Sequence, residues 1–304
     1  MSENNVVQEQ NAGAPVNPEA PKKIRIGLVF LSLVPMAILM MVQTMAQIPF
    51  LILAVINAMD EAQTMPDLDV YTEMMNIFSD KYAIYAYLIY AVIGLVIFSL
   101  WYYKGFVKKN PKVKLGDVFT VKSVISSILI VGALYFFITA FMTLAELLLP
   151  QAMELYKEMV EAAGIVSDPI LTIVYAIILG PILEELVFRG VTYGLLEKAG
   201  LKPGLIILIS SLLFGAIHLI LVQVLYAAFF GMFLGFLRYK YRSIKITIVT
   251  HILFNFTGTY ISSFIEQYSP GNAVIYILGG ISMFVLVGAI LLINSDKKAF
   301  KPAK

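Results

Sequence analysis

The sequence predicts an all-α fold, a polytopic bundle of about eight transmembrane helices. Hydrophobic residues make up 60% of the 304 residues and charged residues only 14%, whereas soluble domains contain about 25% charged residues. Apolar stretches long enough to cross a bilayer, each about 20 residues, recur along the chain. Lys and Arg gather beside alternate ends of these stretches. We therefore expect the chain to form one bundle with the bilayer as its solvent.

The first segment, residues 1–21, is polar and rich in Asn, Gln, Glu, Ala and Pro. It lacks the basic start and apolar core of a signal peptide, so we expect a disordered cytosolic tail. The chain contains no cysteine, which excludes disulfides, thiolate metal sites and cysteine nucleophiles. Its basic residues follow helix ends and form no stripe with aromatic residues, so no nucleic-acid partner is expected.

The next segment, residues 22–150, is predicted to contain three spans. Pro35 and Pro49 fall within the first span, which we expect to be tilted or kinked. The predicted spans are 26–56, 82–103 and 124–149.

Residues 151–167 form an outer loop or an interfacial helix. Met153, Tyr156 and Val160 recur at helical spacing, opposite Glu154 and Glu158, as in a helix lying on a membrane surface. A solvated loop is the alternative.

The last two segments are a core, 168–264, and a C-terminal part, 265–304, with the last span and a basic cytosolic tail. Pro181 is expected to interrupt the first helix of the core. The predicted spans are 169–196, 203–220, 221–239, 246–264 and 273–294.

The distribution of charge predicts the orientation. Nearly all of the 22 Lys and Arg residues lie beside span ends that face one side, and the exceptions are Lys81, Lys157 and Arg189. Loops on the other side are acidic. Because Lys and Arg prefer cytosolic loops, we expect a multi-pass protein of the cytoplasmic membrane with both termini in the cytosol.

A few ionisable or amide side chains fall inside predicted spans, where their burial is costly and indicates a functional site. They are Glu184, Glu185, Arg189, His218, His251 and Asn255.

Helical spacing assigns these side chains to faces. Glu185 and Arg189 are four residues apart and can pair. Glu184 points about 100° away from Glu185 and can face another partner. His251 and Asn255 share one face.

Helical rise predicts how deep the groups lie. Glu184 and His218 should lie roughly 21 and 24 Å above the cytosolic edge, and His251 lower than the roughly 15 Å of Asn255. The depths of Glu184 and His218 match well, and tilt or a break at Pro181 would bring His251 level with them.

For each of these side chains, a purely structural role is the alternative to a role in a functional site. The Glu185–Arg189 pair can be a neutralised ion pair that locks two helices, and a buried histidine can be a satisfied hydrogen-bonding residue. Phe214, four residues before His218, is expected to serve packing.

Three ordered motifs carry a family resemblance. Glu-Glu-x-x-x-Arg at 184–189, Phe-x-x-x-His at 214–218 and His-x-x-x-Asn at 251–255 resemble those of the CAAX protease and bacteriocin-processing family, also called Abi. Its best-known branch is the type II CAAX prenyl endopeptidases. The resemblance covers residues 168–264.

The resemblance implies an intramembrane endopeptidase that acts by glutamate-activated water. Glu184 would be the general base, His218 would hold or polarise the water, and His251 with Asn255 would donate hydrogen bonds to the oxyanion. The expected partners are a membrane-associated peptide or protein substrate and the lipid bilayer. The sequence carries no signal for an oligomeric state.

By the same resemblance, Glu185 and Arg189 would position the loop or the substrate end. No cofactor is required in this mechanism. The alternative is a zinc site formed by Glu184, His218 and His251, with an open position for water.

Three other functions compete with proteolysis. A proton-coupled transporter can use Glu, His and Arg in a bundle with a broken helix. Two intramembrane histidines can ligate a haem if they lie at one height, which the depth estimate disfavours. A non-catalytic scaffold or bacteriocin-immunity protein would keep the fold without turnover.

Overall fold

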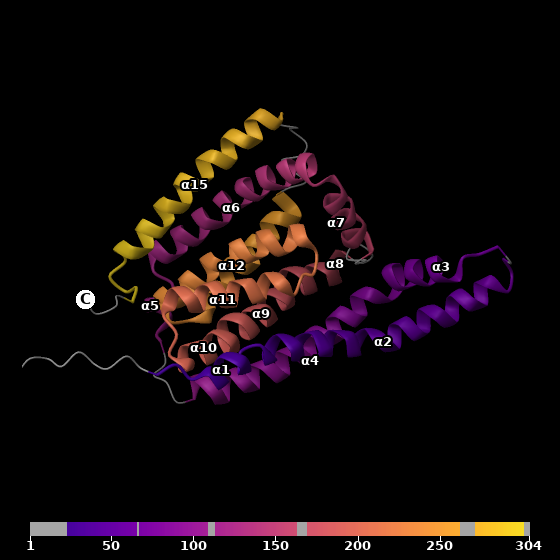
Figure 1. Cartoon of the computed structure of the whole chain (residues 1–304), viewed down its shortest axis with the longest axis horizontal. Helices are drawn as coiled ribbons and strands as arrows, with labels where there is room; N and C mark the ends of the chain where they lie inside the picture. The colour runs from indigo at the N-terminus through magenta and orange to yellow at the C-terminus, as the bar shows by residue number, and fades with distance from the viewer. Residues whose placement is uncertain (1–22, 66, 109–112, 163–168, 262–270, 301–304) are drawn as a thin grey trace, which may run out of the picture.

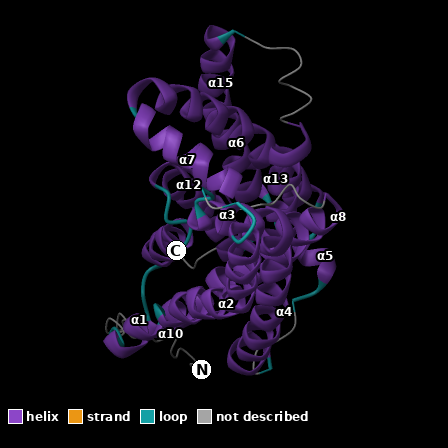
Figure 2. Ribbon diagram, turned by 90° about the vertical axis from the view of Figure 1, so that its right-hand side faces the viewer, coloured by secondary structure: helices purple, strands orange, loops and turns teal. Residues whose placement is uncertain are grey.

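The computed structural model describes residues 23–65, 67–108, 113–162, 169–261 and 271–300. In these ranges all regular elements are helices, which confirms the predicted all-α class (Figure 2). The predicted tail, residues 1–21, lies outside them.

Within these described ranges, six helical runs are long and apolar enough to cross a membrane, so the protein is a multi-pass membrane protein. The predicted span 203–220 corresponds to a shorter helix, α11 (Pro203–Ala216), of 14 residues. The predicted span 246–264 corresponds to α13 (Ile244–Phe256) and the π-helical turn η5 (Thr257–Ile261) that continues it, and residues 262–264 lie outside the described ranges. A full span needs about 20 residues. The six long runs are Ile26–Ala62, Val70–Val107, Val121–Leu148, Ile170–Ala199, Leu221–Tyr241 and Asn272–Ser295.

The first two runs form an elongated arm at one side of the bundle (Figure 1). Pro35 lies in the first turn of α2, where its missing N–H leaves no hydrogen bond unmade, so the chain breaks just before it and not within the helix. The elements are α1 (Ile26–Leu31), α2 (Val34–Ala62), α3 (Val70–Ile77), the π-helical turn η1 (Phe78–Tyr82), α4 (Ala83–Tyr102) and the π-helical turn η2 (Tyr103–Val107).

On the other side, α6 (Val121–Leu148) packs along α15 (Asn272–Ser295) after the short α5 (Leu115–Val118) (Figure 1). A Cβ atom at Gly279 would approach the Cβ of Ala140 to 2.5 Å, so a glycine is required for this close approach. Residues 150–162 form a helix, α7 (Pro150–Ala162), whereas residues 163–167 of the predicted segment lie outside the described ranges, and its place on the membrane surface stays a prediction.

The motif Glu-Glu-x-x-x-Arg lies in the central run, which changes between α-helical and π-helical geometry. Pro181 lies in the first turn of α9, directly after a π-helical segment, so the predicted interruption is a change in helix type. The run ends at Gly200, whose φ of 86° suits glycine. Its elements are α8 (Pro169–Thr172), η3 (Ile173–Leu179), α9 (Gly180–Glu185), η4 (Leu186–Thr192) and α10 (Tyr193–Ala199).

The central run is enclosed by its neighbours. Phe188, Arg189 and Tyr193 are among the largest fully buried side chains of the described residues. The run contacts α2 and α4 on one side and α11, α12 (Leu221–Tyr241) and α13 on the other. The motif therefore lies in the interior of the bundle, away from lipid.

Candidate active site

Glu184 and Glu185 end α9, and their side chains face different surroundings. The Glu184 side chain is 19% exposed and lines a cavity of about 640 Å³. Glu185 is fully buried and does not line this cavity. The two carboxylates thus have different surroundings, but the expected separate partners are not found, because both contact His251, on opposite edges of its ring.

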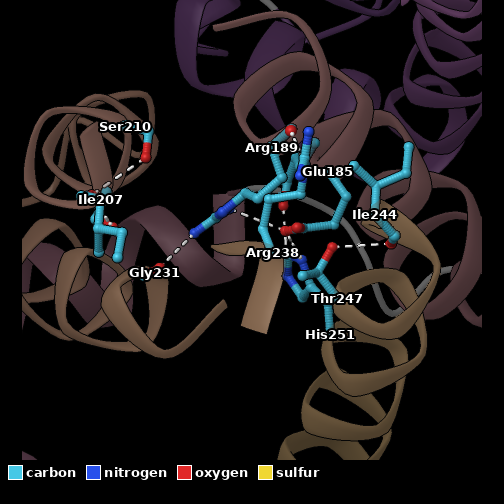
Figure 3. Close-up of polar contacts among 11 residues, drawn as sticks. Glu185, Arg189, Ile207, Ser210, Gly231, Arg238, Ile244, Thr247 and His251 are labelled. Atoms are coloured by element: carbon cyan, nitrogen blue, oxygen red, sulfur yellow. Dashed lines mark hydrogen bonds and ion pairs between the residues drawn. The ribbon is translucent and has the colours of Figure 1, made fainter. Parts of the chain in front are cut away.

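A linear array of charged and polar groups runs from the interior to the cavity. Arg189 Nη1 lies 2.9 Å from Glu185 Oε1, and His251 Nδ1 lies 3.0 Å from the same oxygen. On the other edge of the ring, His251 Nε2 lies 3.5 Å from Glu184 Oε2. Figure 3 shows Glu185 between Arg189 and His251. The predicted Glu185–Arg189 pair is thus present, and it leads to His251 and not to the cavity.

Arg189 is held from several directions. Arg189 Nη2 donates to the carbonyl oxygen of Gly231 at 3.0 Å, and Arg238 Nε donates to the carbonyl oxygen of Arg189 at 3.2 Å (Figure 3). Its guanidinium carbon lies 4.4 Å from the centre of the Phe214 ring. A Cβ atom at Gly231 would approach Arg189 Nη2 to 2.9 Å, so glycine is needed there. The guanidinium therefore has one fixed position.

His218 lies beyond the end of α11, in a turn that includes Leu219 with a φ of 62°. The expectation that this histidine sits within a span is therefore wrong. Its Nδ1 lies 3.1 Å from Nε2 of Gln223 on α12. Sequence reasoning missed Gln223, because the turn brings it to His218 at a separation that no helical spacing indicates.

Phe214 packs among the polar groups. Its ring meets His218 edge-on with centroids 5.6 Å apart, and meets His251 in the same way at 5.5 Å. The expected packing role is confirmed, and it keeps Arg189 and both imidazoles at fixed separations.

Asn255 joins α13 to the central run. Its Nδ2 donates to the carbonyl oxygen of Ala176, in the π-helical η3, at 2.8 Å. Asn255 also lines the cavity, as do Glu184, His218 and His251. The four residues predicted to be catalytic therefore share one cavity.

The depth estimate for His251 was wrong, because His251 reaches Glu184. The estimate used the α-helical rise for the whole segment between Glu184 and Lys198, and η4 occupies half of it. A π-helix bonds residue i to i+5 and fits more residues into a turn, so this part of the run is shorter than estimated, which accounts for part of the difference.

The predicted zinc ligands do not form a metal site in this structure. Among the described residues, no group of three or more His, Cys, Asp and Glu side chains is arranged to hold a metal ion. The contacts of Gln223 and Glu185 engage Nδ1 of His218 and of His251, and neither contact takes up Nε2. The hydrolysis proposed for this site uses no metal, and the zinc alternative stays a prediction.

The cavity wall is mainly aromatic and apolar. Glu184 is the one carboxylate among its described lining residues, which include no Lys or Arg. Its aromatic residues are Tyr135, Phe136, Tyr156, Phe214, Tyr226, Phe230 and Phe254.

Comparison with known families matches residues 166–257 to the model described as type II CAAX prenyl endopeptidase Rce1-like. The matched stretch contains all three motifs. This stretch is similar to the type II CAAX prenyl endopeptidases, as the three motifs predicted. The match covers less than a third of the chain and lies almost wholly within the predicted core, 168–264. No curated protein and no solved structure gave a match. At the family level, this similarity supports an intramembrane endopeptidase.

Proposed function

We propose that this protein hydrolyses a peptide bond of a membrane-associated peptide or protein with water activated by Glu184. One observation carries the proposal. Glu184 is a carboxylate in the cavity wall, and its Oε2 lies 3.5 Å from Nε2 of His251, whose other ring nitrogen is already engaged by Glu185.

The array fixes the tautomer of His251. Glu185 is paired with Arg189 and therefore ionised, so it accepts the proton of His251 Nδ1. A neutral His251 then presents the lone pair of Nε2 to Glu184. A proton that Glu184 has taken from water is stabilised by this lone pair.

Glu184 can then move a proton in both halves of the reaction. It accepts a proton from water as the water oxygen attacks the carbonyl carbon, and it returns that proton to the amide nitrogen as the C–N bond breaks. General acid–base catalysis of this kind contributes about 10²–10⁴-fold to the rate.

One of the two groups assigned to oxyanion stabilisation differs from what the resemblance implied: His218 replaces His251, and Asn255 keeps its role. With Gln223 Nε2 donating to His218 Nδ1, His218 carries its proton on Nε2 and becomes a donor. Asn255 uses one amide hydrogen for Ala176 and keeps the other. We therefore assign the oxyanion to His218 and Asn255.

Glu185 and Arg189 receive a positioning role in this proposal. Both are fully buried and outside the cavity wall, so they cannot contact a substrate there. Their part is to orient His251. This differs from the expectation that they position the loop or the substrate end.

The test uses detergent-purified protein and a library of quenched-fluorescent peptides. Glu184→Gln is compared with the parent and with Glu197→Gln, a matched control in α10 of the same run, where the exposed Glu197 pairs with Arg242 at 2.6 Å. We expect cleavage by the parent and by Glu197→Gln and none by Glu184→Gln, with all three equally folded. Retained cleavage by Glu184→Gln would contradict the proposal.

A chelator arm separates the two chemistries. Cleavage that resists the chelator supports the glutamate mechanism. Cleavage that is lost with the chelator and restored by added zinc favours the zinc alternative.

A further inference from the structure

The two ends of the bundle differ in charge. Basic side chains gather at the end where α10 and α12 finish, α13 begins and α15 finishes, and this end carries the C-terminus in Figure 1. The opposite end carries α7. The basic side chains are Lys198, Lys202, Arg238, Lys240, Arg242, Lys245, Lys297 and Lys298.

The cavity occupies the half of the bundle away from this basic end. On α12 its lining residues run from Gln223 to Phe230, and Phe230 lies about 12 Å before Arg238 by helical rise. On α15 they are Ile275 and Leu278, in the first two turns of a helix that finishes at the basic end. Separate helices therefore agree on the placement.

The rim of the cavity lies at the end that carries α7. Tyr156 of α7 contributes to the wall, as do Gly258 and Thr259 of the π-helical turn η5 (Thr257–Ile261). Gly258 and Thr259 are exposed. The cavity thus leads from Glu184 toward the end opposite the basic residues.

The wall disfavours a negatively charged occupant and is mainly apolar. Glu184 is the one carboxylate among the described lining residues, and none of them is Lys or Arg. A free peptide carboxylate near Glu184 would meet a like charge and no cationic side chain in this wall. Apolar and aromatic side chains of a substrate would instead pack against the aromatic wall.

We propose that the substrate enters from the α7 and η5 end, which the charge pattern assigns to the non-cytosolic side, and that it presents an internal, uncharged segment with apolar or aromatic side chains. The side of entry follows from the cavity and the basic end together. The substrate class rests on the proposed function.

The absence of cysteine makes the side of entry directly measurable. Thr259→Cys and Tyr156→Cys place a thiol at the rim, and Lys297→Cys places one at the basic end, where Lys297 is exposed. Intact spheroplasts that express each variant are treated with a membrane-impermeant maleimide, before and after permeabilisation.

We expect both rim variants to react in intact spheroplasts and Lys297→Cys to react only after permeabilisation. The inference is overturned if the rim thiols react only after permeabilisation, or if neither reacts even in detergent. The same labelling in a Glu184→Gln background does not depend on turnover, so it decides the side of entry even if the protein cleaves nothing.

The substrate class has its own test. Peptides blocked at both ends and carrying apolar or aromatic residues should be cleaved, and adding Asp beside the scissile bond should reduce cleavage. Cleavage restricted to peptides with a free C-terminal carboxylate would overturn the class and leave the proposed function intact. No cleavage of any peptide would instead count against the proposed function.

Discussion

At the scale of single residues, the site depends on a carboxylate that is neutralised inside the bundle. Glu185 has no exposure, and its Oε1 meets both Arg189 and His251. Removing one member of a buried ion pair costs about 3–5 kcal/mol, because the remaining charge is left uncompensated. The buried charge that would remain after the loss of either Glu185 or Arg189 therefore affects stability more than the attraction between the two side chains does.

Arg189→Met should destabilise the protein by about 3–5 kcal/mol in the free energy of unfolding, because Glu185 then keeps a buried charge without its cation. The double variant Glu185→Gln with Arg189→Met should be destabilised less than Arg189→Met alone. Thermal unfolding in detergent measures both. A double variant that loses as much as the sum of the single variants would show that the two charges do not interact.

Gln223→Leu should lower turnover by about 10²-fold, the order expected for misplacing a catalytic group, because His218 loses the donor that holds its ring and tautomer. Gln223→Glu should lose as much, since a carboxylate accepts the Nδ1 proton and removes it from Nε2. Steady-state rates on one peptide provide the measurement. Turnover that survives in Gln223→Glu would remove His218 from the oxyanion role.

At the scale of elements, the site is assembled by helices that approach closely and by helices that change type. A Cβ atom at Gly215 of α11 would approach the carbonyl oxygen of Val224 of α12 to 2.6 Å. That contact sets the start of α12, which carries Gln223, against the end of α11, which leads to His218. Small residues allow this approach, as is typical of membrane helices.

Gly215→Ala should therefore lower the unfolding temperature, because a backbone oxygen cannot move aside as a side chain can. The matched control is Gly204→Ala in the same helix, where a Cβ atom meets nothing within 4 Å. That control should leave stability unchanged or raise it by up to about 1 kcal/mol, since alanine favours a helix more than glycine does. Equal effects of the two changes would contradict the packing account.

The sequence predicted most of the arrangement of the helices, but it did not predict where a helix changes from α-helical to π-helical geometry. Composition and charge predicted the helical membrane class, and four-residue spacing predicted the Glu185–Arg189 pair. The π-helical segments η3 and η4 are not indicated by a period of 3.6, and η4, which lies between Glu184 and Lys198, is part of the reason that the height of His251 relative to Glu184 came out too low. Their geometry is decided by packing against neighbouring helices, as the contact between Asn255 and the Ala176 carbonyl oxygen illustrates.

His218 and Gln223 show the same limit in another form. A hydrophobic stretch over 203–220 predicted a span that contains His218, whereas α11 ends at Ala216 and the histidine lies in a turn. An apolar composition indicates that a segment is buried, but it does not indicate at which residue a helix ends. The partner of a turn residue can then be found only from the three-dimensional structure.

At the scale of the whole molecule, the basic end is closed by contacts between segments far apart in sequence. Asp296, just after α15, accepts hydrogen bonds from Thr120 before α6 and from Tyr241 at the end of α12. Lys298 adds an ion pair with Asp117 at 2.8 Å. These contacts hold α6, α12 and α15 together at the end away from the cavity.

The contacts of Asp296 also predict a dependence on pH. Burial raises the pKa of Asp296, but hydrogen bonds from Thr120, the Lys298 backbone and Tyr241 together hold that pKa below its ordinary value. A carboxyl group with a lowered pKa stabilises the fold above its ordinary pKa and loses this contribution as the pH falls through the lowered pKa. Asp296→Asn should therefore lower the unfolding temperature near neutral pH.

The difference between the parent and Asp296→Asn should shrink at acidic pH, because the parent is then protonated as well. Asp80→Asn, at an exposed position in η1, is the control and should change little at either pH. A difference that is independent of pH would show that the charge of Asp296 does not contribute.

The most direct test of the central claim is the turnover of Glu184→Gln relative to Glu197→Gln on one peptide that the parent cleaves, at equal folded fractions. The account predicts a loss of about 10²–10⁴-fold for Glu184→Gln, the contribution of a general base, and parent-like turnover for Glu197→Gln. Parent-like turnover of Glu184→Gln would contradict the claim that this carboxylate activates the water.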